Sequence, residues 1–329
     1  EAGTQYNVLH GYTSELDSTL FYGNITPVNK DRKLAITINT YGEDVESVGY
    51  KIRSLEDKSL IENTEVSGYQ VTDNKINVTL NIKNLLDTGK EYALEVVLKT
   101  KKHDAVYYYT RIMYGTDYNL QKKLDFVRDF NACTFDSARL KDIGGYLETS
   151  SVGDNTNYGK VNINCSLSQI GWGDLEPYIE SEITPEIISI NDDVAIIRLD
   201  YRVGAANDYS SSDTYNVNEY YRIRQTNSGF YLLNFEREMN QVFDAKNDLT
   251  SSAKINLGIN SSTYVNCTSD EKGIYTYFVN QGSLWCFSSS SQTFTRVFSF
   301  RGEETDSVRE DYDAHNIKIM KIEDNGDAT

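Results

Sequence analysis

Several residue types are scarce in this sequence of 329 residues, and each shortage excludes classes of protein. Three prolines leave no proline-rich stalk or linker. Three histidines, His10, His103 and His315, lie in different segments, so neither a Ser-His-Asp triad nor a multi-histidine metal site is expected. The four cysteines contain no C-x-x-C pair, which argues against zinc and thioredoxin-type sites. We therefore expect no catalytic residues, no metal and no cofactor.

Long apolar runs and basic segments are also missing. No stretch approaches the roughly 18 apolar residues that a membrane-spanning helix requires. The net charge is −17, and the acidic residues outnumber the basic ones along the whole chain. Nucleic acid and anionic membrane surfaces should therefore be repelled. Glycine-rich phosphate loops of the G-x-x-x-x-G-K and G-x-G-x-x-G types are absent, which disfavours nucleotide use.

Aromatic residues are abundant, with 25 tyrosines and 12 phenylalanines, and the hydrophobic share of 39% suffices for real cores. The chain begins at Glu1 without an initiator methionine, and its composition is rich in tyrosine and serine. We interpret it as an ectodomain whose signal peptide or membrane anchor lies upstream; a fragment of a cytosolic protein is the alternative. Either disulfides or buried free thiols fit the cysteines, which are Cys133, Cys165, Cys267 and Cys286.

Period-two apolar patterns predict a β-sandwich within residues 1–116. In Lys75–Ile82 every second residue is apolar, as expected for a half-buried strand. The segment Leu86–Tyr92 resembles the entry to the sixth strand of fibronectin type III and immunoglobulin-like domains, where a tyrosine hydroxyl ties the corner to the backbone. Residues 1–32, in which Thr19–Tyr22 are apolar, are expected to supply the first strand. The other predicted strands are Leu34–Thr40, Ser47–Leu55, Tyr92–Lys99 and Val106–Met113.

Residues 117–250 predict a helix-on-sheet, α+β domain. Leu120, Leu124, Val127 and Phe130 recur at helical spacing over 117–131, with Thr116 or Asp117 as cap. On the solvent side of this helix we expect Lys122, Lys123, Arg128 and Asp129. A second short helix is predicted over Ala138–Leu147, and a tight hairpin at Asn227–Gly229. Strands are predicted over Val161–Leu167, Val194–Val203, Tyr215–Gln225 and Gly229–Phe235.

Residues 251–329 predict a three-stranded meander over Ile274–Val279, Ser283–Phe287 and Thr293–Phe300. This order of aromatic strands and turns looks like part of a β-propeller blade. Residues Ile317–Ile322 then look like the first half of a further hairpin, so we expect a propeller-like region that continues beyond Thr329. The fold class is therefore mainly β, with an α+β middle domain.

Three short segments, Leu9–Thr13, Tyr107–Arg111 and Phe230–Leu233, prompt a comparison that extends over nearly the whole chain. With them the chain resembles a group of uncharacterised, membrane-anchored extracytoplasmic proteins of Gram-positive bacteria. A fainter similarity is to extracytoplasmic accessory proteins that restrain a cell-wall sensor kinase. The first resemblance implies a cell-surface location and imports no activity.

One patch qualifies as a ligand site, Gly171–Glu176, where Trp172 stands beside Asp174 and Glu176. An aromatic platform next to carboxylates suits sugar, although a core tryptophan in a solvated loop gives the same sequence pattern. Two oxygen-rich turns, Gly153–Asn157 and Asp324–Asp327, do not match a calcium loop. Alternate members of the tyrosine runs Tyr107–Tyr109 and Tyr220–Tyr221 could also share a binding face.

These observations favour a non-enzymatic binding or scaffold protein that recognises protein or glycan at the cell surface. Any membrane attachment would use an anchor outside this chain. Two alternatives remain: an extracytoplasmic sensor or regulator of a membrane kinase, and the non-catalytic part of a carbohydrate-active enzyme.

Overall fold

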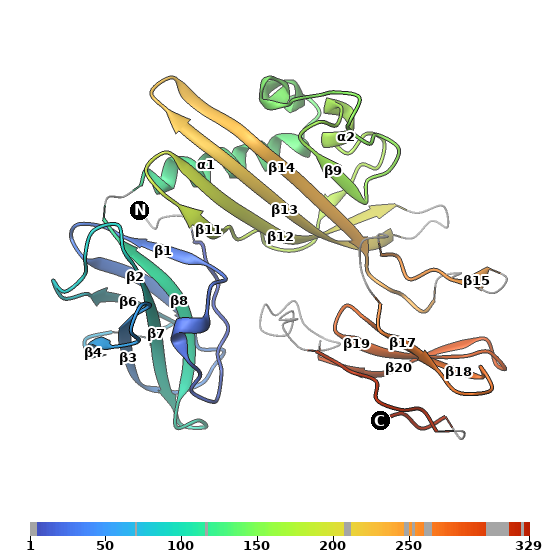
Figure 1. The fold of residues 1–329 in the computed structure, drawn as a ribbon, viewed down its shortest axis with the longest axis horizontal. Helices are drawn as coiled ribbons and strands as arrows, with labels where there is room; N and C mark the ends of the chain where they lie inside the picture. The colour runs from blue at the N-terminus through green and yellow to red at the C-terminus, as the bar shows by residue number, and fades with distance from the viewer. Residues whose placement is uncertain are drawn as a thin grey trace.

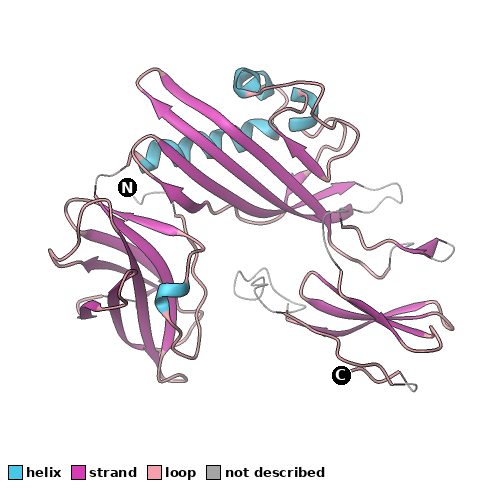
Figure 2. Cartoon of the chain, in the orientation of Figure 1, coloured by secondary structure: helices cyan, strands magenta, loops and turns pink. Residues whose placement is uncertain are grey.

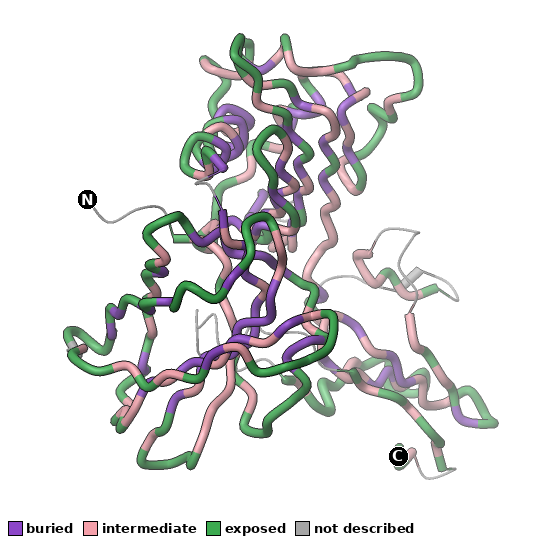
Figure 3. The backbone as a smooth tube through the Cα atoms, turned by 60° about the vertical axis from the view of Figure 1, so that its left-hand side comes forward, coloured by how far each residue is buried: buried purple, intermediate pink, exposed green. Residues whose placement is uncertain are grey.

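The computed structural model describes residues 5–69, 71–115, 118–206, 212–246, 250–251, 254–259, 265–300, 316–323 and 326–329. The protein is mainly β, with 46% of its residues in strands and 10% in helices. Buried hydrophobic side chains form three separate clusters. Buried and exposed residues alternate along many strands, which is the burial pattern that period-two sequences produce (Figure 3). No helix within the described ranges is long and apolar enough to cross a membrane.

The N-terminal part is built from two facing sheets (Figure 1). The larger sheet has the order β1 (Ile25–Val28), β8 (Val106–Tyr114), β7 (Glu91–Thr100), β3 (Val45–Ser54) and β4 (Leu60–Val66). The smaller sheet has the order β2 (Lys33–Asn39), β6 (Lys75–Asn81) and β5 (Val71–Thr72). β1 runs parallel to β8, and the other pairs are antiparallel.

All five strands predicted in this part form, because their alternating apolar residues line the space between the sheets. Residues 1–32 supply the first strand, as predicted, but the strand does not include the apolar run Thr19–Tyr22. Residues Ser18–Leu20 form a 3₁₀ turn, η1, because the Asp17 side chain accepts a hydrogen bond from the backbone N–H of Thr19. The first strand is β1, and β4 was missed.

The Leu86–Tyr92 corner has the predicted geometry. Leu86 and Tyr92 are both buried, and the Tyr92 hydroxyl accepts a hydrogen bond of 2.8 Å from the backbone N–H of Asp87. This contact ties the turn before β7 to the first residues of the strand.

We expect Tyr92→Phe to reduce the free energy of unfolding of this part by about 0.5–1.5 kcal/mol, the usual net value of one hydrogen bond. The ring remains, so packing is preserved and only the bond to Asp87 is lost. Urea denaturation of the Tyr92→Phe variant measures the effect, with the exposed Tyr41→Phe as the matched control. Equal losses in both variants would refute a role for the corner.

The middle part places helix α1 (Leu120–Thr134) against one antiparallel sheet, as Figures 1 and 2 show. The sheet has the order β10 (Tyr178–Ile179), β12 (Val194–Ala206), β13 (Ser212–Thr226), β14 (Gly229–Gln241) and β9 (Lys160–Asn162), and β11 (Glu186–Ile190) also pairs with β12. A ring contact between Phe130 and Tyr221 joins helix and sheet. The predicted helix, the three predicted strands that correspond to β12, β13 and β14, and the tight hairpin between β13 and β14 are confirmed. The second predicted helix, Ala138–Leu147, forms as a 3₁₀ helix, η2 (Leu140–Tyr146).

Two details of the middle part differ from the predictions. Lys123 is fully buried rather than solvated, because its Nζ donates to the carbonyls of Asn191 and Asp192 at 2.5 and 3.0 Å. The strand predicted to reach Leu167 ends at Asn162, and helix α2 (Leu167–Ile170) begins after Ser166, whose hydroxyl accepts from the backbone of Gln169. The caps predicted at Thr116 and Asp117 lie outside the described residues.

The third part is a four-stranded antiparallel sheet with the order β17 (Cys267–Ser269), β18 (Tyr275–Asn280), β19 (Ser283–Ser288) and β20 (Thr293–Ser299). A two-strand ribbon of β15 (Thr250–Ser251) and β16 (Lys254–Ile255) precedes it. The predicted meander is confirmed as β18–β20. Residues 317–322 form no assigned strand, although Lys321 exchanges two backbone hydrogen bonds with Thr329 in a short closing turn.

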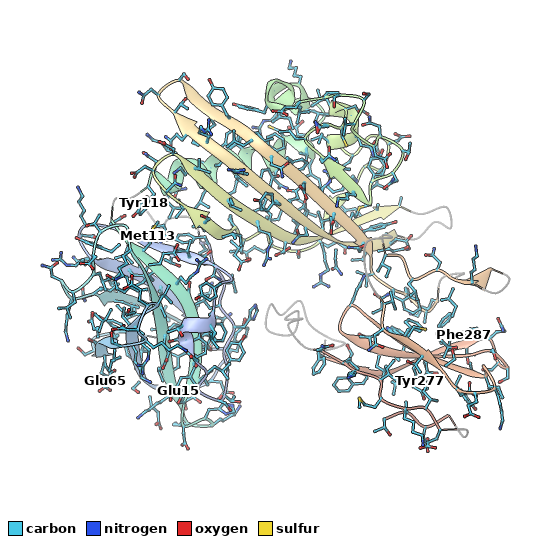
Figure 4. All side chains as sticks on the ribbon, viewed as in Figure 1. Glu15, Glu65, Met113, Tyr118, Tyr277 and Phe287 are labelled. Carbon is cyan, nitrogen blue, oxygen red and sulfur yellow. The ribbon has the colours of Figure 1, made fainter. Side chains whose placement is uncertain are left out.

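The first and middle parts meet at a junction that contains both apolar contacts and hydrogen bonds. Ile25 and Met113 belong to the hydrophobic cluster of the middle part, and Met113 lies near Tyr118 in Figure 4. The Arg111 guanidinium donates to the carbonyls of Tyr22 and Ile188. Asn7 donates to Ile25 and accepts from the backbone of Ile187. These contacts hold β1 and β8 against the β11 region.

Candidate functional site

The structure does not bring the predicted sugar-site residues together at one surface. Trp172 is 1% exposed, and its Nε1 donates to the Thr134 hydroxyl at 3.3 Å. Asp174 and Glu176 are exposed in the following turn. The buried indole therefore offers no open face to a sugar ring, and ligand binding by this trio remains a prediction without geometric support.

Trp172 belongs instead to a buried polar cluster between α1, α2 and the middle sheet. The guanidinium carbon of Arg237 lies 3.4 Å from the centroid of the indole ring, a cation–π contact. Arg237 also donates to the carbonyls of Ile170 and Gln169 at 2.9 and 3.0 Å. Glu219 lies 3.9 Å from the Arg237 guanidinium, and both side chains are fully buried.

Glu219 is surrounded by donors. Its carboxylate accepts from Asn131 at 2.8 Å, from the Tyr201 hydroxyl at 3.0 Å and from the Tyr221 hydroxyl at 2.6 Å. Burial, reinforced by the Glu219 charge, raises the pKa of both tyrosines well above the usual value. Burial lowers the pKa of Arg237, and the neighbouring carboxylate opposes that shift. The arrangement compensates a buried charge and holds α1 on the sheet.

Other candidate groups are dispersed over the described residues. His103 is exposed in the turn before β8, His10 lies in the N-terminal segment, and His315 lies outside the described residues. Within the described ranges no three His, Cys, Asp or Glu side chains are grouped to hold a metal ion. The Asp154 turn is closed internally by hydrogen bonds from Thr156, whereas residues 324 and 325 are not described.

The four cysteines are free thiols, so the disulfide alternative is not realised. Cys133, Cys165 and Cys286 are buried and Cys267 is exposed. Burial raises the pKa of the Cys133 and Cys286 thiols, which keeps them protonated and poorly nucleophilic at neutral pH.

An exposed apolar surface lies on the last strand of the third sheet and just after it. Val297, Phe298 and Phe300 are 49%, 47% and 37% exposed, and we call these three residues the edge-strand surface. Among the described residues, β20 is the terminal strand in the order of its sheet. The sequence predicts this strand as part of a β-propeller blade, and sequence alone does not distinguish an edge strand from a central one.

Two shallow recesses lie on the N-terminal part, with volumes of about 390 and 380 Å³. Glu15 borders both of them. Their lining is largely charged, and neither contains a residue of the predicted sugar site.

Comparison with known proteins adds no family to this description. None of the protein-family models matches the chain, and no curated protein is similar to it.

Proposed function

We propose that the chain is a non-enzymatic binding or scaffold protein that recognises another protein through the edge-strand surface. The observation that carries this proposal is the exposure of Val297 and Phe298 on β20, the terminal strand among the described residues, and of Phe300 just after it. A terminal strand offers backbone donors and acceptors to an added strand, and exposed apolar side chains supply contact area. A strand edge pairs with the backbone of an extended peptide, which a glycan lacks, so this surface suits a protein partner.

Charge specifies the partner further. The third sheet has no net charge, because two acidic residues, Asp270 and Glu271, are offset by two basic ones, Lys272 and Arg296. An apolar segment with basic flanks therefore meets no strong electrostatic repulsion from this sheet. The whole chain carries −17, and this field favours the approach of cationic partners. The partner in this proposal is therefore an extended apolar segment flanked by lysine or arginine.

The proposal includes two finer assignments of fold. An immunoglobulin- or fibronectin-like first domain is supported by its two-sheet order, by the parallel β1–β8 pair and by the Tyr92 corner. A propeller-blade-like third domain is supported by its antiparallel four-strand order. We place the protein at the cell surface, attached through an anchor outside this chain, on the basis of its acidic, tyrosine-rich composition.

The amidated peptide KKVTVTVKK tests this proposal, because it is apolar, extended and cationic. We expect it to bind the intact chain, and we expect Val297→Lys combined with Phe298→Lys to weaken binding at least tenfold. The exposed Val152→Lys variant, far from this sheet in the sequence, should bind as the wild type does. Fluorescence anisotropy of the labelled peptide measures the affinities.

A matched peptide, KKVPVPVKK, keeps the charge but cannot pair as a strand, because proline lacks a backbone donor. Equal binding of both peptides would show that charge alone, and not strand pairing, accounts for the affinity, and would contradict the proposal. Concentration-dependent dimerisation that is abolished by the Val297→Lys and Phe298→Lys pair would also contradict it, because the occupant would then be a second copy of the chain.

A further inference from the structure

A strap formed by residues 12–22 crosses the outer face of the larger N-terminal sheet. Tyr12 pairs with Tyr107 through two backbone hydrogen bonds of 2.8 Å. The Phe21 ring stacks on Tyr109 with centroids 4.4 Å apart, and the Tyr109 hydroxyl accepts from the backbone of Leu16 at 2.8 Å. The strap is thus fixed to β8 near both of its ends and in the middle.

The recess of about 390 Å³ lies between this strap and strands β3 and β7. Its volume falls within the range of roughly 300–1,000 Å³ that small-molecule sites occupy. It is bordered by strap residues Glu15–Ser18, by Arg53 and Lys58, and by Glu95. Figure 4 shows Glu15 at the end of the first domain remote from Met113, so the site is separate from the junction with the middle domain.

Two donors in this recess are not satisfied by the protein. The Ser18 side chain is 3% exposed, and its hydroxyl has no hydrogen-bond partner among the described residues. The half-buried Arg53 makes one long hydrogen bond, 3.4 Å to the Lys58 carbonyl, and no carboxylate within the described residues pairs with it. A buried hydroxyl without a partner is costly, so an occupant that accepts hydrogen bonds would be stabilising.

The carboxylates of the recess, Glu15, Asp17 and Glu95, outnumber the two lysine ammonium groups that pair with them. Glu15 and the 2%-exposed Glu95 share one ammonium, since Lys51 Nζ lies 2.8 Å from an oxygen of each. By contrast, Asp17 has its own partner in Lys58 at 2.7 Å. Hydrogen bonds from Lys58 and Thr19 lower the pKa of Asp17 to about 2, so it stays ionised in neutral solution.

We propose that this recess binds a small zwitterion, an amino acid or a short peptide, whose carboxylate contacts Arg53 and Ser18 and whose ammonium contacts Glu15 and Glu95. Arginine matches a carboxylate with two parallel hydrogen bonds, and the serine hydroxyl adds a third donor. The ammonium supplies the second cation that the two glutamates lack. The other recess, on the far side of Glu15, gives a dipeptide room to extend.

Titration calorimetry on the full chain tests this inference with L-alanine and L-alanyl-L-alanine as probes. We expect at least one of them to bind, and we expect Arg53→Gln and Ser18→Ala to weaken that binding at least tenfold and severalfold, respectively. The difference between the two probes distinguishes a free amino acid from a peptide. Arg224→Gln, which alters an exposed strand arginine of the middle sheet, is the matched control and should leave the affinity unchanged.

N-acetyl-L-alanine amide, which has neither charge, should not bind. Circular dichroism melting of each variant shows whether a loss of affinity is caused by unfolding. If Arg53→Gln does not fold, the Ser18→Ala variant still tests the inference. The inference is overturned if neither probe binds at millimolar concentration, or if the neutral compound binds equally well. Since this recess lies on the first domain, the result is independent of the peptide test on the third sheet.

Discussion

Replacing Glu219 by alanine is expected to destabilise the middle domain by about 3–5 kcal/mol, the usual cost of leaving one member of a buried ion pair uncompensated. Arg237 would remain fully buried without its counter-charge, and the Tyr201 and Tyr221 hydroxyls would lose their acceptor. Native-state hydrogen exchange on residues 212–226 and 229–241 measures the loss. The opening free energy of these strands should fall by that amount.

Two further variants separate charge from packing. Removing the exposed Glu236 side chain should change stability by no more than about 0.5 kcal/mol, since surface substitutions usually have such small effects. Adding Arg237→Met to Glu219→Ala should restore part of the lost stability, because no uncompensated charge then remains in the core. A double variant less stable than Glu219→Ala would contradict this explanation of the cluster.

Replacing Phe243 by alanine is expected to unfold the third sheet while the rest of the chain stays folded. Phe243 lies just after β14 and packs its ring against Phe278, Trp285 and Phe294 at 5.4, 4.8 and 5.5 Å between centroids. Truncation of a buried aromatic costs about 3–5 kcal/mol. Among the described residues this cluster has three buried hydrophobic residues, Phe243, Phe278 and Phe287, so that loss is large relative to the stability of so small a core.

Hydrogen exchange resolves this prediction by segment. Residues 267–299 should exchange rapidly in Phe243→Ala, whereas 194–206 should remain protected. The control is Tyr231→Ala, which removes a half-exposed ring from the adjacent strand β14 and should leave the third sheet protected. Simultaneous loss of protection in both segments would show that the middle and third sheets unfold as one unit.

Local periodicity predicted most of the strands, because alternating apolar residues have to face a core. β6 has the burial pattern that its sequence predicts, with Ile76, Val78 and Leu80 inward. β4 was missed because its apolar residues Leu60, Ile61 and Val66 do not alternate, and its buried position is occupied by Glu62. It forms as a hairpin with the preceding strand β3, and this pairing leaves no apolar period in the sequence of β4.

The candidate sites were less predictable than the fold. Trp172 looked available because glycine and acidic residues flank it, but Arg237, far along the chain, covers its ring. Lys123 looked solvated because it is charged, but its ammonium donates to two backbone carbonyls of a distant turn. The recess under the strap combines Ser18, Arg53 and Glu95 from three segments. Burial of a polar residue depends on its tertiary partner, and a single sequence does not name that partner.

The most direct measurement of the binding proposal is amide hydrogen exchange of the intact chain with and without saturating KKVTVTVKK. A strand added at the edge of the third sheet must bond to backbone groups of β20. The proposal therefore predicts slower exchange within residues 293–299 in the presence of this peptide, and no such change with KKVPVPVKK. Unchanged exchange across β20, or protection confined to another sheet, would contradict the claim that this edge recognises a partner.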